Sequence, residues 1–265
     1  SLEELLGIYK DIFQLESLSG RVILFDEIQY LKNWDVQLKV LVDTFKDTKF
    51  IASGSAASAL RRKSIESGAG RFTDFLLPPL TFYEYLEIHP LIERDSLISH
   101  SRGALDIEGL NREFVKYINY GGFPEAIFDP DIQNNPQRFI RSDIIDKVLL
   151  RDLPALYGIS DPQELYRLFS ALVYQTGSEI SYEGLSQSSG IAKNTIKKYI
   201  NYLEAAFLIQ TVRRVDDTGK TFQKQNFLKV YLTNPSLYSA IYEPVDGSDS
   251  KTLGSLVETA IFSQW

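Results

Sequence analysis

The chain has 265 residues, of which 44% are hydrophobic and 24% charged, a composition that suits folded domains and excludes a disordered or fibrous protein. It contains no cysteine and two histidines, so disulfides, thiolate metal sites, a cysteine nucleophile and a histidine-rich zinc site are excluded. It has neither an apolar run of about 18 residues nor a signal-peptide pattern, which predicts a cytoplasmic protein without a membrane partner. Methionine is absent as well, so we expect the chain to be a fragment of a longer protein.

The net charge of -7 is unevenly distributed along the chain. Residues 171–240 hold eight basic and five acidic side chains, whereas acidic residues outnumber basic ones in 1–90, 91–170 and 241–265. Because the phosphate backbone of nucleic acids attracts positive surfaces, any contact with nucleic acid is expected in residues 171–240.

The first part of the chain alternates between helical and strand patterns. Apolar residues at helical spacing over 2–13 predict a helix, and the continuous apolar run Arg21–Phe25 predicts a parallel strand covered on both faces. A second helical pattern covers Trp34–Phe45, and a second short apolar run covers Phe50–Ala52. Strand, helix and strand in this order predict a right-handed crossover unit of an α/β sheet.

A loop, a third strand and a helix are expected to complete this region. The third strand is predicted at Phe75–Leu77. Thr81, with Glu84 three residues later, has the spacing of a capping box that opens a helix. Residues 1–90 are therefore predicted to be the C-terminal half of a three-layer αβα core.

The remainder is predicted to be mostly helical. Residues 91–170 are expected to be an all-helical segment, broken at the Gly-Gly-Phe-Pro turn 121–124, whose glycines permit positive φ. Residues 171–240 show three helical patterns and then two strand patterns around a turn, which predicts a winged helix-turn-helix. Residues 241–265 are predicted to begin a further, truncated domain.

The predicted winged helix carries its basic side chains on the last helix and the hairpin. Its inward positions are apolar, so the lysines of that helix are expected on the outward side. The five candidates for contact with DNA or a partner protein are Lys193, Lys197, Lys198, Arg213 and Arg214.

The strongest chemical feature is the strand that ends at Phe25 and is followed by two carboxylates. Ligands of open α/β folds bind at the carboxyl edge of the sheet, which is where Asp26 and Glu27 are expected. Asp26 can hold Mg²⁺ and Glu27 can polarise a water molecule for in-line attack on a γ-phosphate, as in the Walker B arrangement of ATPases. Acidic turn residues after an apolar strand are also common without such a role.

Three further residues are candidates for the same site. Ser53 and Ser55 follow the second strand and offer hydroxyls toward the same phosphate, although strand-end serines are also ordinary turn formers. Arg71 follows a glycine turn, where its guanidinium is either a ligand of a phosphate in its own or a neighbouring subunit's site, or one half of a surface ion pair.

A phosphate site also requires a G-x-x-x-x-G-K-[ST] loop, whose backbone N–H groups cradle the phosphates. The only Gly-Lys-Thr string is Gly219–Thr221, and the position five residues before Gly219 is Arg214 rather than glycine. That string also falls in the predicted hairpin turn instead of between a strand and a helix. We therefore expect the Walker A loop of the intact protein to lie upstream of this chain.

Six motifs in collinear order, over roughly residues 20 to 260, together resemble one family. They are Phe25–Leu31 with Trp34, Ala52–Ser55, Ala69–Phe72, Pro79–Glu84, Gly121–Glu125 and Arg151–Pro154. The chain resembles the prokaryotic AAA+ type P-loop ATPases that carry a helical and winged-helix region after the core.

The resemblance implies roles for individual residues. Asp26 would be the Walker B magnesium residue, Glu27 the catalytic base, and Ser53 or Ser55 the sensor-1 group, with ATP and Mg²⁺ as cofactors. Gly254–Glu258 resembles the start of the C-terminal part, which is nuclease-like in many relatives.

The function expected for the intact protein is ATP hydrolysis coupled to the winged-helix module, with self-association into a homo-oligomer as a further expectation. The present chain is expected to be inactive alone because it lacks the Walker A loop. One alternative is a DNA-binding regulator whose degenerate ATPase core is a scaffold. Another is a protein-interaction role for the winged helix, which is favoured by the small positive charge of residues 171–240.

Overall fold

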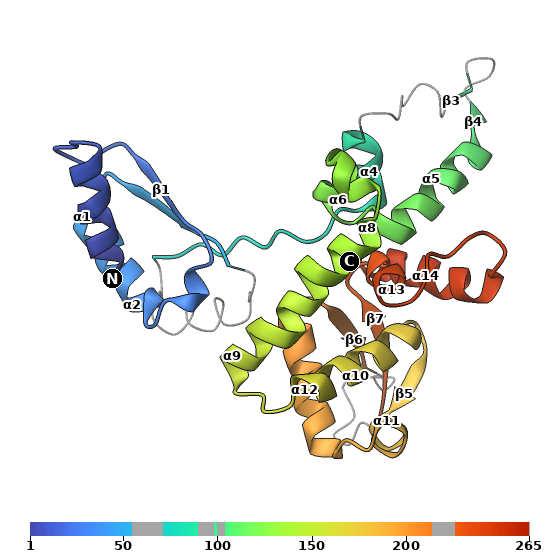
Figure 1. The fold of residues 1–265 in the computed structure, drawn as a ribbon. Coiled ribbons are helices and arrows are strands. Elements are labelled where there is room, and N and C mark those ends of the chain that lie inside the picture. Colours follow the sequence, from blue (N-terminus) through green and yellow to red (C-terminus); the bar gives the residue numbers. More distant parts are fainter. Residues whose placement is uncertain (55–70, 90–97, 100–103, 214–225, 265) are drawn as a thin grey trace, which may run out of the picture. The chain divides into compact units, whose positions relative to one another are not determined.

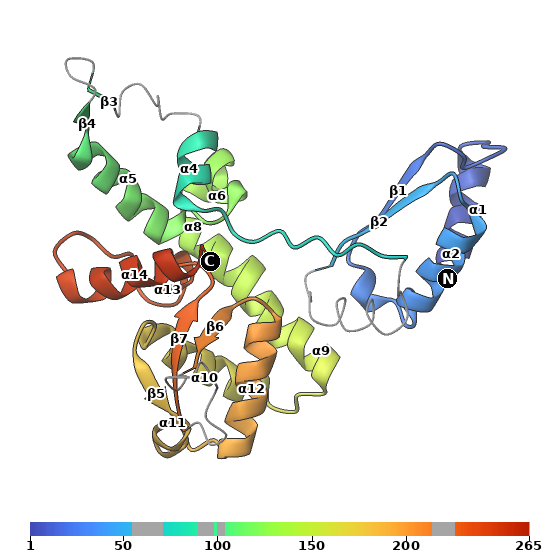
Figure 2. The same ribbon diagram turned by 180° about the vertical axis from the view of Figure 1, so that it is seen from behind.

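The computed structural model describes residues 1–54, 71–89, 98–99, 104–213 and 226–264. The chain forms two compact units, Ser1–Leu77 and Pro78–Trp265. Helices predominate, and the strands form small sheets (Figures 1 and 2).

Unit 1 contains the predicted strand, helix and strand. Its elements are α1 (Leu2–Ile12), β1 (Val22–Phe25), the 3-10 helix η1 (Ile28–Tyr30), α2 (Trp34–Thr44) and β2 (Lys49–Ala52). The two strands are parallel, with Val22 opposite Lys49 and Phe25 opposite Ala52. The prediction of a parallel crossover unit is therefore confirmed.

One face of the β1–β2 pair is packed and the other is exposed. The core of unit 1 combines α1 and α2 with the inward residues of both strands; its fully buried members are Leu2, Leu6, Leu18, Ile28, Trp34, Leu38 and Leu41. On the opposite face, Leu24 is 71% exposed and Val22 is also exposed. The prediction that this strand is covered on both faces is therefore wrong for the described structure, because the covering helices lie on one side only.

The expected third strand is also wrong. Residues 72–81 adopt no regular secondary structure, and Phe75 and Leu77 are 87% and 84% exposed. An apolar triplet becomes a strand only where a neighbouring strand supplies hydrogen bonds, and the described part of unit 1 pairs only β1 with β2.

Unit 2 is a larger, mainly helical body. It begins with α4 (Phe82–Ile88), β3 (Ile98–Ser99), β4 (Ala104–Leu105), α5 (Ile107–Tyr120), α6 (Pro124–Phe128), α7 (Pro130–Gln133) and α8 (Pro136–Phe139). Two π-helical stretches, η3 (Ile140–Asp146) and η4 (Val148–Asp152), then lead into α9 (Leu153–Tyr157). The antiparallel pair β3–β4 contradicts the prediction that residues 91–170 are all helical.

The start of unit 2 packs around aromatic side chains. Thr81 and Glu84 form the predicted capping box at the start of α4, and Tyr85 is fully buried against Tyr117 of α5. Gly122 follows α5, and a Cβ atom at this position would lie 2.2 Å from the Asn234 side chain. The φ of Gly122 is not positive, so glycine is required here by close packing and not by the backbone freedom that a glycine also permits.

The C-terminal part of unit 2 contains the predicted helices and hairpin strands. Its elements are α10 (Pro162–Tyr174), β5 (Glu179–Ser181), α11 (Tyr182–Ser189), α12 (Lys193–Ala205), β6 (Ile209–Val212), β7 (Phe227–Leu232), α13 (Ser236–Ile241) and α14 (Ser250–Phe262). The strands form an antiparallel sheet in the order β5-β7-β6, with Ile209 opposite Leu232. The turn of the predicted hairpin lies outside the described residues.

A single core holds these elements together. It includes Phe169 of α10, Ile196 and Ile200 of α12, Val230 of β7 and Leu256 of α14. In Figure 1, α10, α11 and α12 surround the strands below α13. Between α11 and α12 the chain reverses at Gly190, which has φ 72°.

Gly190 provides a test of this turn. A Cβ atom at Gly190 would meet no atom within 4 Å, so Gly190→Ala should lower the free energy of unfolding of unit 2 through its left-handed backbone alone, by about 1 kcal/mol. Gly254 lies inside α14, where an added methyl group would also meet open space, so Gly254→Ala should raise stability by roughly 0.5–1 kcal/mol. Urea unfolding followed by circular dichroism measures the change in the free energy of unfolding for both variants. If the two variants changed this free energy in the same direction, the assigned left-handed backbone at Gly190 and helical position of Gly254 would be contradicted.

Candidate functional site

The candidate site lies where the parallel strands of unit 1 end. Asp26 follows β1 directly and Ser53 follows β2 directly, and the last paired residues are Phe25 and Ala52. The Ser53 amide donates to the Phe25 carbonyl at 2.8 Å, and the Ile28 amide donates to the Ser53 carbonyl at 3.0 Å. The backbone ladder therefore continues past the strands and holds the two side chains at the same edge.

Asp26 and Ser53 contact each other through their side chains. The Ser53 hydroxyl donates to Asp26 Oδ1, and the Glu27 amide donates to the same oxygen at 3.0 Å. Both Asp26 and Ser53 are exposed, so this polar pair faces solvent at the carboxyl edge of the strands.

Glu27 adopts a backbone conformation that is unusual for its residue type. Its φ and ψ are 51° and 40°, in the left-handed region, which costs about 1–2 kcal/mol for a residue with a Cβ atom. The next residue, Ile28, is buried in the core and starts η1, and the Gln29 side-chain amide donates to the Glu27 carboxylate. These contacts orient the Glu27 carboxylate and hold the strained turn in place.

The donor atoms at this edge fit Mg²⁺. A carboxylate oxygen of Asp26 and the hydroxyl oxygen of Ser53 are hard ligands, which Mg²⁺ prefers. Mg²⁺ in phosphate-transfer sites takes one or two protein oxygens and completes its octahedron with water and phosphate oxygens. The exposed Asp26–Ser53 pair offers such a partial shell.

The structure pairs Arg71 with a side chain other than those of Asp26 and Ser53. Arg71 Nε donates to Asp43 Oδ1 at 2.9 Å and to Oδ2 at 3.2 Å, and this hydrogen bonding lowers the pKa of the Asp43 carboxyl. Because α2 runs back from the carboxyl edge of β1 toward the start of β2, its late residue Asp43 lies near the opposite edge of the strands. Ser55 lies outside the described residues.

The basic candidates of residues 171–240 lie around α12. Lys193 forms a 3.3 Å ion pair with Glu183 of α11, and the Lys197 ammonium lies 5.3 Å from the centre of the Tyr182 ring. Lys198 and Arg213 are exposed. Arg214 lies outside the described residues.

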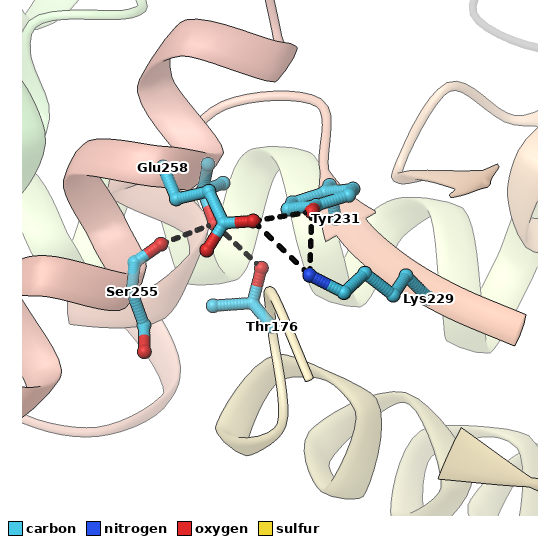
Figure 3. A network of polar contacts seen from close by, with 6 residues as sticks. Thr176, Lys229, Tyr231, Ser255 and Glu258 are labelled. Carbon is cyan, nitrogen blue, oxygen red and sulfur yellow. Dashed lines mark hydrogen bonds and ion pairs between the residues drawn. The ribbon is translucent and has the colours of Figure 1, made fainter. Parts of the chain in front are cut away.

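A second polar cluster, which the sequence patterns did not predict, joins α14 to the sheet (Figure 3). The Tyr231 hydroxyl donates to Glu258 Oε1 at 2.6 Å, and Lys229 Nζ lies 3.3 Å from the same oxygen. The hydrogen bond from Tyr231 is the main cause that lowers the pKa of Glu258, and the Glu258 carboxylate in turn raises the pKa of Lys229. The sequence signal is the spacing of Lys229 and Tyr231, which places both on one face of a strand.

Buried hydroxyls continue this cluster into the interior. The Thr176 and Thr259 hydroxyls are 2.8 Å apart, and the Leu232 amide donates to Thr176 at 3.3 Å. The Tyr231 ring also stacks on Phe262, with 4.2 Å between the ring centres. These contacts fix α14 on β7 within unit 2.

Comparison with protein families identifies the larger part of the chain. Residues 111–248, just over half of its length, match a domain of unknown function, DUF8612. The chain belongs to the DUF8612 family. Residues 1–86 match an AAA domain, so the N-terminal part of this DUF8612 protein is related to AAA-like P-loop ATPases.

Curated relatives of this DUF8612 chain are uncharacterized proteins of bacteria and archaea. One from Haemophilus influenzae is 27% identical over 209 residues, which are 77% of this chain and 48% of the relative. Two from Methanocaldococcus jannaschii, MJ1637 and MJ1544, are 25% and 26% identical and cover 98% and 99% of this chain. The chain spans about half the length of these relatives.

No solved structure matches the chain. Among the described residues, none of the helices combines the length and apolar character required to cross a bilayer.

The cluster at α14 predicts a pH dependence of stability. The lowered pKa of Glu258 means that its contribution is present above the ordinary carboxyl pKa of about 4.5 and is lost as the pH falls below that value. Glu258→Gln should therefore be less stable than the parent at pH 7 but lose less stability on acidification from pH 5 to 3. Thermal unfolding across this range measures it, with Glu243→Gln as the exposed control in the same unit. Parallel curves for the parent and Glu258→Gln would contradict the role of Glu258.

Proposed function

We propose that this chain contributes the Mg²⁺-binding and water-activating half of the ATP site of an AAA+ type ATPase. The observation that carries the proposal is the contact of the Ser53 hydroxyl with the Asp26 carboxylate at the carboxyl edge of parallel strands. The AAA match of residues 1–86 supports it independently. The phosphate-cradling loop would come from another part of the full-length protein, because the printed sequence contains no G-x-x-x-x-G-K-[ST] string.

Each residue at the edge has a proposed task. Asp26 would hold Mg²⁺ through a carboxylate oxygen, and the bound ion would neutralise negative charge on the phosphates. Glu27 would accept a proton from the attacking water, with its carboxylate oriented by the strained turn and by Gln29. Ser53 would fix the rotamer of Asp26 and act as the sensor-1 group, with Ser55 as the alternative for that second role.

Arg71 is a member of the proposed site that is paired with Asp43. Its guanidinium is held by Asp43, so contact with a phosphate would require this exposed ion pair to break. Exposed pairs contribute little stability, typically about 0.2–1 kcal/mol, so a phosphate would compete with Asp43 easily. Because Asp43 lies near the opposite edge of the strands from Asp26, Arg71 would serve the site of a neighbouring copy in a homo-oligomer, with its own site as the alternative.

We also propose that residues 171–240 are a winged helix. The order helix, strand, helix, helix, strand, strand over α10, β5, α11, α12, β6 and β7 supports this assignment, as does the antiparallel sheet that the three strands form. Residues 1–90 would then be the ATPase core portion, 91–170 the helical lid, and 241–265 the first part of a C-terminal domain. Nucleotide state would pass from the core through the lid to the winged helix.

The roles of Asp26 and Glu27 can be separated in the full-length protein. Glu27→Gln should keep ATP binding but lose hydrolysis, because an amide accepts no proton from water. Asp26→Asn should weaken the dependence of ATP binding on Mg²⁺, because a carboxylate ligand is lost. Calorimetry with ATP and Mg²⁺ and a phosphate-release assay measure the two effects.

Two controls make this experiment decisive. Asp47→Asn removes an exposed carboxylate from the same unit, in the segment just before β2 at the other edge of the strands, and should leave Mg²⁺ dependence unchanged. Residues 1–265 alone should show no micromolar ATP binding, because they lack the backbone amides that cradle the phosphates. Equal turnover by the parent and Glu27→Gln would remove Glu27 from the mechanism, and absence of ATP binding by the full-length parent would favour a degenerate scaffold.

A further inference from the structure

The exposed side chains on the outward face of α12 are all amides or ammonium groups. Its four exposed side chains are Asn194, Lys197, Lys198 and Asn201, whose spacing of three, four and seven residues places them on one side of the helix. The opposite side is buried in the core of unit 2 through Ile196, Tyr199, Ile200 and Leu203. The helix is therefore fixed by packing, and its fully exposed positions carry only amides and ammonium groups.

Neighbouring residues position the positive charges of this face. Lys193, at the start of α12, is tied to Glu183 of α11, and Lys197 lies over the ring of Tyr182. Burial raises the pKa of Tyr182, and the positive charge of Arg213, the residue after β6, opposes this rise. Lys197 therefore contacts the Tyr182 side chain, and the charge of Arg213 acts on the same side chain.

The one carboxylate in α12, that of Glu204, has a structural role. Glu204 accepts hydrogen bonds from the Thr211 amide, at 3.1 Å, and from the Thr211 hydroxyl, which joins the end of α12 to β6. Glu204 is not among the exposed side chains of the helix. No negative charge therefore opposes the lysines on the exposed positions of α12.

This chemistry distinguishes between two kinds of partner. Protein interfaces centre on aromatic or aliphatic anchors and are depleted in lysine, and none of the exposed positions of α12 is apolar. DNA recognition uses Lys and Arg on phosphates and pairs Asn with adenine edges in the major groove, which is wide enough for one α-helix. The exposed amides and ammonium groups match the second set of requirements.

We propose that α12 is a recognition helix for duplex DNA. Lys197, Lys198 and Arg213 contact phosphates, and Asn194 and Asn201 face base edges in the major groove. The surplus of basic residues in 171–240 is small, and it is the position of Lys197 and Lys198 on one exposed face, rather than the total charge, that supports this assignment. The proposal rests on the winged-helix assignment but not on ATP hydrolysis, so it is tested without nucleotide.

The test uses the 265-residue chain and a fluorescein-labelled duplex of mixed sequence. Fluorescence anisotropy between about 50 and 200 mM KCl gives the affinity and the slope of log affinity against log salt. Lys197→Ala/Lys198→Ala should weaken binding and reduce the slope by about 1.8, because each lost phosphate contact removes about 0.9. Both side chains are exposed, so this variant should keep the circular dichroism spectrum and melting temperature of the parent.

A charge-matched control separates recognition from general attraction. Lys116→Ala/Lys251→Ala also removes two lysines from unit 2, but from α5 and α14, and should leave affinity and slope nearly unchanged. Asn194→Ala/Asn201→Ala should keep the salt slope and lose the preference for sequences that the parent selects from a random duplex pool.

Three results would overturn the proposal. They are absence of binding by the parent at 50 mM KCl, an unchanged affinity and slope in Lys197→Ala/Lys198→Ala, and an equal loss in the control variant. The first two would favour a lid or a protein-docking role for the winged helix, and the third would indicate unspecific attraction of the duplex. None of them bears on the ATP site, which the Glu27 and Asp26 variants test separately.

Discussion

The parallel hydrogen-bonded ladder between β1 and β2 determines where the polar side chains of unit 1 meet. Since both strands point the same way, the residues that follow them lie at one edge, and a single register pairs Phe25 with Ala52. A shift by one residue would move Ser53 away from Asp26 and turn every strand side chain to the other face. The candidate magnesium site therefore depends on backbone pairing more than on any side-chain contact.

In unit 2, the corresponding constraint is the core that α10, α12, β7 and α14 share. It fixes the rotation of α12 about its own axis, because Ile196 and Ile200 are fully buried, and so decides which four side chains reach solvent. The same core receives α14, whose Glu258 and Thr259 bind the strand and the loop beside it. Helix α14 is therefore part of the same packed body as the three-stranded sheet, although the DUF8612 match ends at residue 248.

Sequence patterns correctly predicted features that depend on interactions between residues close together in the chain. The Thr81–Glu84 capping box depends only on residues three apart, and the burial of α12 follows from its apolar periodicity. The proximity of Asp26 and Ser53 could be predicted because the residues that directly follow two paired parallel strands lie at the same edge of the sheet. All three inferences required no knowledge of distant packing.

The predictions that failed, and the contacts that were missed, depend on partner residues elsewhere in the fold, which local sequence patterns do not specify. An apolar triplet such as Phe75–Leu77 carries no information on whether a strand lies beside it. The reason for glycine at 122 is the Asn234 side chain, more than a hundred residues away in the chain. Likewise, the contact of Glu258 with Tyr231 depends on how α14 docks, which the helical pattern of residues 250–262 leaves open.

The uncovered face of the β1–β2 pair also affects how this polypeptide behaves at high concentration. Val22, Leu24 and Ile51 form an exposed apolar row on a two-stranded sheet whose outer edges carry unpaired strand groups in the described structure. Such surfaces favour edge-to-edge association between molecules, which a net charge of -7 counteracts by mutual repulsion. That repulsion vanishes near the sequence pI of about 5.0, so preparations of these 265 residues should precipitate first in mildly acidic buffers.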